Sequence, residues 1–224
     1  VNPFIGTSNS GNTFPGAVVP WGMVSVSPHN SLNAVTGYLY GEKKFYGFGM
    51  VHLSGVGCPE LGSILITITD NDSAVNSEEY NCSCSNEVAT PGFYSVMLDD
   101  QKVSVEVTAT ERSGILKFKS LTKSEKSIVV DVGRSLGIVG GGKIKIVSDS
   151  EIEGYNISGG FCGEANREEV YFTSKFSKNF DRHKIWTNDR FADLTEAQII
   201  DSSIGALLNL NMNENEELLV KVGI

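Results

Sequence analysis

Apolar residues that recur at every second position dominate this sequence. The pattern is clearest over residues 64–69, 103–108, 143–146 and 206–212. A period of two places successive side chains on opposite faces of a strand, so each segment predicts a half-buried β-strand. Clusters of Asn, Asp, Gly and Ser separate these segments, and such residues favour turns. Many short strands with short connections predict an all-β fold, a large antiparallel β-sandwich with few or no helices.

Residues 1–224 are interpreted as a single domain. An all-β domain of this length is common, and the apolar content of 40% is enough for a substantial core. The sequence contains no internal repeat, no low-complexity tract and no linker. Residues 192–199 form the one segment whose composition predicts a short helix. The strand pattern of residues 216–224 runs to the last residue, and we expect the protein to continue beyond it.

Net charge and hydropathy argue against two kinds of partner. The formal net charge is −9 at pH 7, whereas binding to a phosphate backbone needs clustered Lys and Arg. The sequence holds no run of about 18 apolar residues, the length that a membrane-spanning helix requires. We therefore expect no nucleic-acid partner and no membrane span. The first residue is Val, not Met, which fits a processed start and a trimmed one equally well.

Four cysteines stand at positions 58, 82, 84 and 162. Cys82 and Cys84 form a C-x-C pair, which differs from the C-x-x-C spacing of zinc sites and redox motifs. A disulfide between these two would be strained, although either could pair elsewhere. We interpret the cysteines as small buried or free thiols, and their number leaves the redox compartment open.

Two other motifs carry little functional signal. The segment Gly137-x-x-x-x-Gly142-Lys143 comes close to a phosphate-binding loop, but Ile144 stands where Ser or Thr would hold magnesium. The following residues alternate like a strand, so the segment is interpreted as a glycine-rich hairpin turn. The three histidines at 29, 52 and 183 lie too far apart in the sequence for a zinc motif.

Carboxylates are numerous but are not paired by the local sequence. Glycoside hydrolysis needs two of them, one on each side of the scissile bond. Glu60, Glu111, Asp131 and Glu164 are the candidates for such roles. Because nothing in the sequence pairs any two of them, we predict no catalytic residue within this chain.

The first 23 residues combine Pro, Gly and aromatic side chains with almost no charge. Pro and Gly disfavour a regular helix, and the density of apolar side chains is too high for a solvated linker. The segment therefore predicts an ordered loop, and loops of this kind often carry a site. A second glycine-rich loop follows His52 and leads into the strand over 64–68. His52 is either a hydrogen-bonded loop residue or a donor to a ligand.

Aromatic side chains crowd into the first fifty residues, interleaved with glycines. They are Phe14, Trp21, Tyr38, Tyr40, Phe45, Tyr46 and Phe48. Core packing explains most of them. A surface rich in aromatic and glycine residues also favours sugar recognition, because rings stack on the apolar faces of pyranosides while polar groups bind the hydroxyls.

Taken in order, these segments resemble the N-terminal domain of glycoside hydrolase family 92, the calcium-dependent exo-acting α-mannosidases. The similar segments are NPFIGT at 2–7, TFPGA at 13–17, VPWGM at 19–23, HLSGVGC at 52–58, PGFYSV at 91–96, TATER at 108–112 and YFTSKFSK at 171–178. The resemblance therefore covers essentially the whole chain.

This resemblance implies an N-terminal β-sandwich followed by a larger helical (α/α)-barrel domain that this chain lacks. The active site would lie between the two domains and hydrolyse terminal α-linked mannose from glycans with inversion. The catalytic carboxylates and the main calcium ligands would belong to the helical domain. On this basis we expect the chain alone to be inactive, to bind no calcium itself and to dock the helical domain through an exposed apolar patch. Family members are exported, so we expect a periplasmic, cell-surface or extracellular location in a bacterium.

The resemblance also suggests which residues contact sugar hydroxyls or shape the site. They are Gly11, Asn12, Thr13 and Phe14 from the opening loop, His52, Ser54, Gly57 and Cys58 from the second loop, and Arg112 as a weaker candidate. Three positions depart from the family pattern. Asn12 stands where His is common, Val56 replaces Thr, and Ser63 replaces Asp. Loss of these polar groups would change subsite specificity or weaken the enzyme.

Two other hypotheses remain open from the sequence. One is a stand-alone carbohydrate-binding module, which predicts that no catalytic domain follows residue 224. The other is a structural, adhesin-like sandwich, which predicts no exposed apolar flank.

Overall fold

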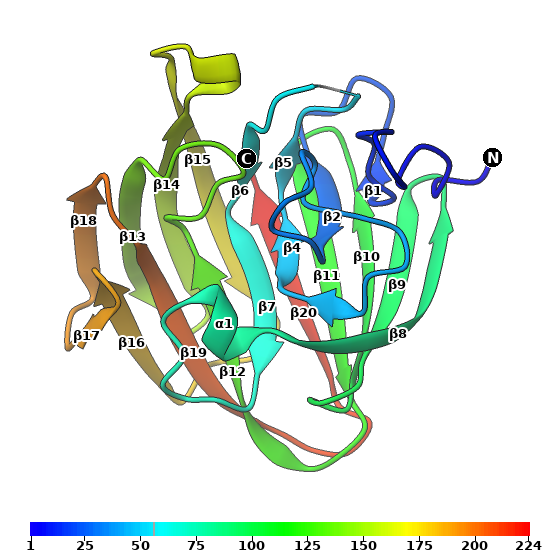
Figure 1. Ribbon diagram of the computed structural model, residues 1–224. Coiled ribbons are helices and arrows are strands. Elements are labelled where there is room, and N and C mark those ends of the chain that lie inside the picture. The colour runs from blue at the N-terminus through cyan, green and yellow to red at the C-terminus, as the bar shows by residue number, and fades with distance from the viewer. Residues whose placement is uncertain (56) are drawn as a thin grey trace.

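The computed structural model describes residues 1–55 and 57–224. These residues form two large sheets that pack face to face (Figure 1). Every strand pair between described residues is antiparallel. The predicted antiparallel β-sandwich is therefore confirmed.

One sheet, called the smaller sheet below, has eight strands within the described residues. In spatial order they are β1 (Ala17–Val18), β2 (Ser25–His29), β4 (Gly47–Gly49), β7 (Leu65–Thr69), β12 (Ser124–Asp131), β19 (Ile204–Met212), β16 (Arg182–Thr187) and β17 (Arg190–Ala192).

The other sheet, called the larger sheet, has ten strands in the same part of the chain. In spatial order they are β18 (Glu196–Ile200), β13 (Gly141–Ser148), β14 (Glu151–Gly159), β15 (Arg167–Phe176), β20 (Glu217–Gly223), β11 (Ser113–Ser120), β10 (Val103–Ala109), β9 (Phe93–Leu98), β8 (Cys82–Thr90) and β3 (Lys44–Phe45). A separate ribbon pairs β5 (Val51–His52) with β6 (Leu61–Ser63).

The helical content of the described chain consists of two short pieces. Helix α1 (Ser77–Tyr80) begins at Asn76, whose side-chain oxygen accepts a hydrogen bond from the Glu78 N–H at 3.1 Å. A single 3₁₀ turn, η1 (Phe161–Gly163), lies between β14 and β15. Neither piece is long or apolar enough to cross a membrane, and the same holds for every helix among the described residues.

The helix predicted over residues 192–199 is wrong. Strand β17 ends at Ala192, and Glu196–Ile200 forms β18, which pairs with β13 at the edge of the larger sheet. Exposed and half-buried residues alternate along β18. So short a segment gains little from helix propensity, because helix nucleation is costly, and pairing with β13 satisfies its backbone groups instead.

The hairpin predicted for the Gly137–Lys143 segment is also wrong. Gly142 and Lys143 already belong to β13, and residues 132–140 carry the chain from the smaller sheet to the larger one. A Cβ atom at Gly137 would lie 2.5 Å from the Gly159 carbonyl oxygen. Glycine is needed there for close backbone approach, not for a turn between paired strands.

The two sheets differ in how they are buried. Buried and more exposed residues alternate along β9, β10 and β11 of the larger sheet, as predicted. Every residue of β7 in the smaller sheet is buried, although its sequence predicts a half-buried strand. Its outer face is covered by a second cluster formed by α1 and nearby side chains: Leu65, Ala74, Val75, Tyr80, Val129, Trp186 and Leu207.

Aromatic side chains connect the two sheets. Phe48 of β4 in the smaller sheet packs against Phe45 of β3 and Tyr94 of β9 in the larger one, with ring centroids 5.0 and 6.0 Å apart. All three side chains are buried. Both contacts have edge-to-face geometry, which is favourable for aromatic pairs.

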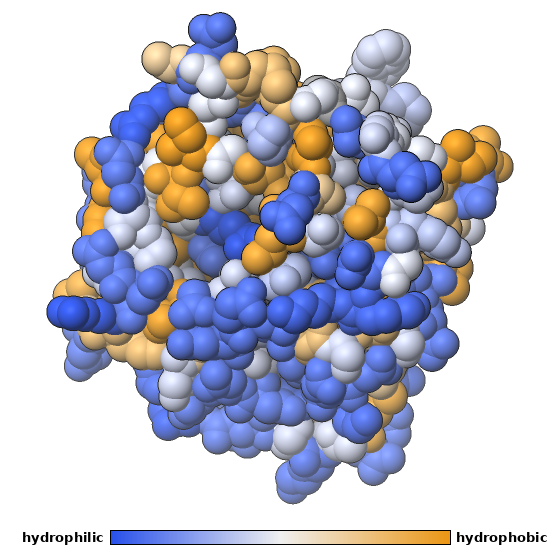
Figure 2. Space-filling view, in the orientation of Figure 1, coloured by the Kyte–Doolittle hydropathy of each residue, from blue (hydrophilic) through white to orange (hydrophobic). Residues whose placement is uncertain are grey.

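Loops from distant parts of the sequence gather at one end of the sandwich. The opening segment, the β5–β6 ribbon and the loop that contains η1 lie at the upper end in Figure 1, and both chain termini lie toward the same end. Hydrophobic residues gather on the upper half of the face in Figure 2, whereas its lower half is hydrophilic.

Replacement of Phe48 by Ala should lower the free energy of unfolding by about 3–5 kcal/mol, because it removes a fully buried ring between the sheets. Urea unfolding measures this change. Ile200→Ala on edge strand β18, where the side chain is 58% exposed, serves as the control and should change stability by less than about 1 kcal/mol. Equal losses in the two variants would contradict the assignment of Phe48 to the inter-sheet core.

Candidate functional site

Two turns and a longer hydrogen bond that closes the loop fold the opening segment back on itself. The N–H groups of Thr7, Gly11 and Thr13 donate to the carbonyl oxygens of Phe4, Ser8 and Gly6, at 3.1–3.2 Å. A Cβ atom at Gly11 would lie 2.0 Å from the Gly6 carbonyl oxygen. Gly11 therefore permits a close backbone crossing, and this crossing gives the loop its shape.

The opening loop contacts the second glycine-rich loop directly. The Gly55 N–H donates to the Asn12 carbonyl oxygen at 3.0 Å. The ring of Phe14 lies against that of His52, with centroids 5.0 Å apart. The structure thus brings together the two loops in which eight of the nine candidate residues lie. Val56 is outside the described residues.

Two members of the second loop face open space. Ser54 and Gly57 are both exposed, and a Cβ atom at Gly57 would meet no other atom within 4 Å. Both positions are therefore accessible from solvent. Ser63, one of the departures from the family pattern, is instead buried, and its hydroxyl has no hydrogen-bond partner among the described residues.

His52, which is half-buried, forms a hydrogen-bonded pair with the buried His29, the last residue of β2. The two Nε2 atoms lie 2.8 Å apart, and His52 Nδ1 lies 2.9 Å from the Ser25 carbonyl oxygen. A carbonyl oxygen only accepts, so the tautomer that satisfies this contact has the proton on Nδ1 of His52 and lets Nε2 accept from His29; the Ser25 hydroxyl, 3.1 Å from Nδ1, is then a second acceptor. His29 Nδ1 is left buried without a partner in the described structure.

This tautomer assignment limits what His52 does in the site. Both of its ring nitrogens have partners within the chain, so neither is available to donate to a ligand in this conformation. Glycines crowd the pair, because a Cβ atom at Gly37 or Gly49 would lie within 3.0 Å of a histidine ring. Of the two roles open to His52 from the sequence, the geometry supports the hydrogen-bonded loop residue.

Both histidines are neutral at neutral pH. Burial lowers the pKa of His52 to about 4. Burial, together with the neighbouring His52 and Arg134, lowers the pKa of His29 well below its usual value. A proton added to either ring would place a charge in a desolvated site.

A disulfide bond ties the second loop to the loop that contains η1. Cys58 and Cys162 are bonded across 104 positions of sequence, and only Cys82 and Cys84 are buried free thiols among the described residues. The interpretation of Cys58 and Cys162 as free thiols is wrong, since strands β6 and β14 bring together two loops that are remote in sequence. Cys58 therefore shapes its loop through a covalent bond and offers no thiol to a ligand.

A carboxyl pair lies beside this disulfide. The Asn166 side-chain amide donates to both Glu168 Oε1 and Glu60 Oε2, and its oxygen accepts from the N–H groups of Gly160 and Phe161. Glu60 is only 4% exposed, and burial, with a further contribution from Glu168, raises its pKa. The network fixes the η1 loop against the second loop.

The other carboxylates noted in the sequence are dispersed. Asp131 accepts a hydrogen bond from the Tyr80 hydroxyl at 2.7 Å and from the Arg134 N–H at 3.1 Å, so it has a structural role. Glu111 lies beside Trp21, whereas Glu164 is exposed. Within the described chain, no three His, Cys, Asp or Glu side chains converge as a metal site would require.

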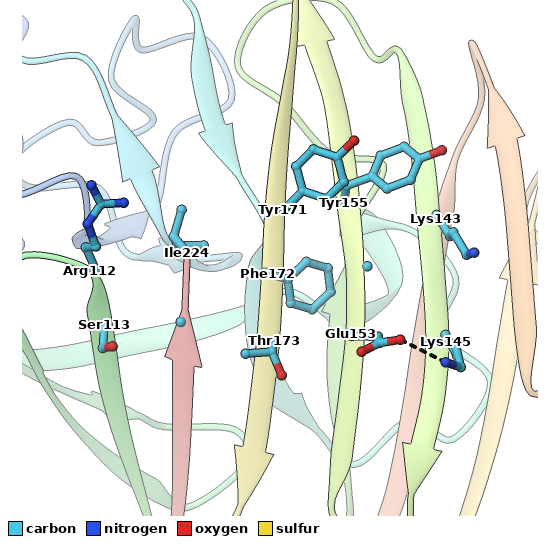
Figure 3. A pocket seen from close by; sticks show the side chains of 12 residues that line it. Arg112, Ser113, Lys143, Lys145, Glu153, Tyr155, Tyr171, Phe172, Thr173 and Ile224 are labelled. Atoms are coloured by element: carbon cyan, nitrogen blue, oxygen red, sulfur yellow. Dashed lines mark hydrogen bonds and ion pairs between the residues drawn. The ribbon is translucent and has the colours of Figure 1, made fainter.

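Arg112 lies between β10 and β11, and its side chain makes no hydrogen bond or ion pair to either of the two loops among the described residues. It borders a groove of about 620 Å³ on the outer face of the larger sheet. Figure 3 shows Tyr155 and Tyr171 side by side above the Lys145–Glu153 ion pair, with Arg112 beyond Ile224. Arg112 also borders a smaller depression beside Trp21. The structure does not bring it together with the other candidate residues.

The sequence analysis missed three residues that support the site. His29, Asn166 and Glu168 each contact a residue of the second loop or its immediate neighbour. Their sequence separations from these partners are 23 to 108 positions, so no local motif contains both members of a pair. The one clue in the sequence was a polar residue within a strand-forming segment, as with His29 in β2.

Comparison with known proteins identifies the class to which this domain belongs. The sequence profile of the Glycosyl hydrolase family 92 N-terminal domain matches residues 1–224. The chain therefore belongs to glycosyl hydrolase family 92, and it is the N-terminal domain found in these glycosidases. The resemblance noted in the sequence is confirmed over its whole length.

Solved structures agree with this assignment. A family GH92 α-mannosidase from Bacteroides thetaiotaomicron matches with a TM-score of 0.90 and 30% identity, covering 100% of this chain and 32% of that one. The same enzyme in complex with mannoimidazole gives a TM-score of 0.89. An uncharacterized secreted glycosidase of Arthroderma benhamiae is 28% identical over 132 residues, which are 53% of this chain and 16% of the relative. This chain thus spans about a third of the solved relatives.

Loss of the disulfide should destabilise the domain. The Cys58→Ser/Cys162→Ser variant should lose about 2–5 kcal/mol of unfolding free energy, because the bond closes a loop of about 100 residues in the unfolded chain. Denaturant unfolding with and without a reductant measures the effect. Reductant should weaken the unmodified chain and leave the variant unchanged; a chain indifferent to reductant would contradict the prediction.

Stability should also depend on pH through the histidine pair. Unfolded histidine has a pKa of about 6.5, so between pH 6.5 and about 4 the unfolded chain binds more protons than the folded one. The contribution of His52 is fully present above pH 6.5 and falls by about 3 kcal/mol as the pH decreases to 4. Unfolding at a series of pH values measures it. His52→Gln should reduce this dependence to the part that His29 contributes, whereas His183→Gln, outside the pair, should retain it in full.

Proposed function

We propose that this chain is the N-terminal sandwich domain of an exo-α-mannosidase that removes terminal α-linked mannose from glycans. The observation that carries the proposal is the hydrogen bond between Gly55 and Asn12, which joins the two loops into one wall. Membership of the family supports it, and so does a relative bound to mannoimidazole.

In this proposal the chain supplies part of the substrate cleft and a second domain supplies the chemistry. Ser54 and the open surface at Gly57 contact sugar hydroxyls, while Phe14 presents its ring. The general acid and base carboxylates belong to a helical domain that follows the sandwich, and the reaction inverts the anomeric centre. The length of the solved relatives supports a further domain, since this chain covers 31–32% of them.

The enzyme is also proposed to depend on calcium, whose ligands would lie mainly in the helical domain. Calcium prefers six to eight oxygen ligands. Among the described residues no three His, Cys, Asp or Glu side chains converge, and we propose that this chain supplies none of the main calcium ligands. The contribution of this domain is to position the sugar.

The helical domain is proposed to dock at the loop-bearing end. Trp21 is fully exposed and Ile5 is 74% exposed, and Figure 2 shows hydrophobic residues gathered toward this end. Exposed apolar surface of this kind marks interaction sites. This surface argues against the adhesin-like hypothesis, which predicts no exposed apolar flank.

Export of the protein to a periplasmic, cell-surface or extracellular location in a bacterium is part of the proposal. Disulfides persist in oxidising compartments, and the Cys58–Cys162 bond supports such a location. One relative is described as a secreted glycosidase.

Hydrolysis of an aryl α-mannoside tests the proposed function. The whole gene product should release mannose with calcium and lose activity with a chelator, and NMR should detect inversion in the first product formed. Residues 1–224 alone should show no turnover. Turnover by this chain comparable to that of the whole protein would contradict the proposal, and a gene product without a helical domain would favour the stand-alone carbohydrate-binding module.

The Gly57→Ala variant of the whole protein tests the cleft assignment. Apart from its two chain neighbours, the added methyl group meets no described atom within 4 Å, so the unfolding midpoint should not change. It would occupy space proposed for the sugar, so kcat/KM should fall about tenfold, equivalent to about 1.4 kcal/mol. Unchanged kcat/KM would remove Gly57 from the cleft.

A further inference from the structure

The larger sheet ends in a strand whose outer edge is free. Strand β18 pairs with β13 on one side and has no neighbouring strand on the other side within the described chain (Figure 1). The Asp201 N–H donates to the Gly140 carbonyl oxygen at 2.9 Å, and the Thr195 carbonyl oxygen accepts from the Ile146 N–H at 2.8 Å. The backbone groups just before and just after β18 therefore point toward β13.

Three residues of β18 direct their backbone groups away from the sheet. Bonded and non-bonded residues alternate along an antiparallel pair, so with residues 195 and 201 bonded to the β13 side, Glu196, Gln198 and Ile200 point outward. Outside the sheet ladder, no described residue forms a hydrogen bond with these three backbones, and all three side chains are exposed. The edge thus presents unpaired donors and acceptors that another strand can bind.

The remaining edges of the two large sheets, within the described residues, are protected from such pairing. Strands β1 and β3 have two residues each, and β17 has three. Strand β8 extends beyond β3, but its register with β9 shifts between Ser85 and Val88, where Asn86 has a φ of 54°. Short strands and bulges are common ways to block an edge. Strand β18 has five residues in regular register and contains neither Pro nor Lys.

Charge does not block the edge of β18 either. Lys143 Nζ lies 2.5 Å from Glu196 Oε1, and Arg167 forms an ion pair with Asp201. The acidic side chains at both ends of the strand are therefore neutralised by cations of the same chain. A second acidic strand can approach without direct repulsion between unpaired carboxylates.

We infer that β18 is a dimerisation strand, which pairs antiparallel with β18 of a second copy of this chain and joins the two larger sheets into one. All three outward residues are paired only when Gln198 faces Gln198 of the second copy, because Glu196 then faces Ile200 of that copy. This register is symmetric about a two-fold axis, as a closed dimer requires. The pairing needs no glycan and is independent of the proposed function.

Exposed apolar side chains favour a second copy over other occupants. Leu194 and Ile200, at opposite ends of β18, are 45% and 58% exposed. In an antiparallel pair the Ile200 end of each strand lies beside the Leu194 end of the other. Each copy thus covers the apolar side chains of its partner, and the same contact is made twice by symmetry.

Sedimentation velocity of residues 1–224 tests for the dimer. A contact of one strand buries less than the area of about 1,200–2,000 Å² found in stable complexes, so the dimer should be reversible. The weight-average mass should rise from that of a monomer toward that of a dimer as the protein concentration increases through the micromolar range.

Disulfide trapping tests the register. Residues in a hydrogen-bonded antiparallel pair have Cα atoms about 5.5 Å apart, which is within the reach of a disulfide. Glu196→Cys mixed with Ile200→Cys should therefore give a cross-linked dimer. Neither variant should cross-link with itself, because like positions lie about 13 Å apart along the strand. Val88→Cys, 51% exposed on the bulged β8, is the control and should cross-link with neither.

A proline substitution tests whether the backbone makes the contact. Gln198→Pro removes an N–H that points away from β13, so it costs no bond within the chain, and edge strands tolerate such a proline. It should weaken dimerisation at least about tenfold. Gln198→Ala keeps the N–H and should dimerise as the unmodified chain does. Circular dichroism reports whether each variant is folded.

A second pair of variants leaves the backbone intact. Ile200→Lys places a charge on the free edge, a device that blocks strand pairing in natural proteins, and it should weaken dimerisation at least about tenfold. Val88→Lys is the matched control, because its side chain is similarly exposed on an edge that is already bulged. The control should leave the dimer unchanged.

Several outcomes would overturn the dimerisation strand. They are a monomer at every concentration, self-cross-linking of either cysteine variant as fast as in the mixture, and equal effects of Gln198→Pro and Gln198→Ala. A whole gene product that stays monomeric while residues 1–224 dimerise would do the same, since another part of the polypeptide would then occupy the edge. None of these outcomes bears on the proposed function, which hydrolysis tests separately.

Discussion

Contact between the two sheets is the constraint on which the remaining structure depends. Phe48 of the smaller sheet interlocks with Phe45 and Tyr94 of the larger one, and β4 lies next to β2, which ends at His29. The smaller sheet is covered on its outer face as well, so its central strands are held from both sides. The loops at the end of the sandwich therefore project from a rigid support, as a preorganised binding site requires.

The sequence was sufficient to predict an antiparallel β-sandwich. It was not sufficient to predict which strands are buried on both faces or where the helix-like segment would pair. Period-two alternation identified the strands of the larger sheet because one face of that sheet is solvated. It could not show that both faces of β7 are buried, since α1 and the Trp186 cluster cover it from remote parts of the chain. Residues 192–199 have helix-compatible composition, and only their pairing with β13 makes part of them a strand.

The sequence could predict those parts of the candidate site that lie within a single continuous segment. The opening loop and the loop after His52 could be paired because each resembles a family segment, and the structure joins them through Gly55 and Asn12. The support beneath them was not predictable. His29, Asn166 and the Cys58–Cys162 bond act across long sequence separations, and such contacts depend on strand order, which a single sequence does not contain.

The Cys58–Cys162 bond lies outside both hydrophobic clusters of the described chain. The sheets thus form through burial of apolar side chains, whereas the second loop and the η1 loop are joined by oxidation of two thiols. In a reducing cytoplasm the domain would lose the stability that the bond contributes, but the fraction that folds would give the circular dichroism of a complete sandwich, because the core residues do not include the bonded cysteines. Its second loop would nevertheless be held only by non-covalent contacts. The redox state of the compartment of synthesis would then decide how well the loop-bearing end is ordered, even in a sample whose secondary structure is complete.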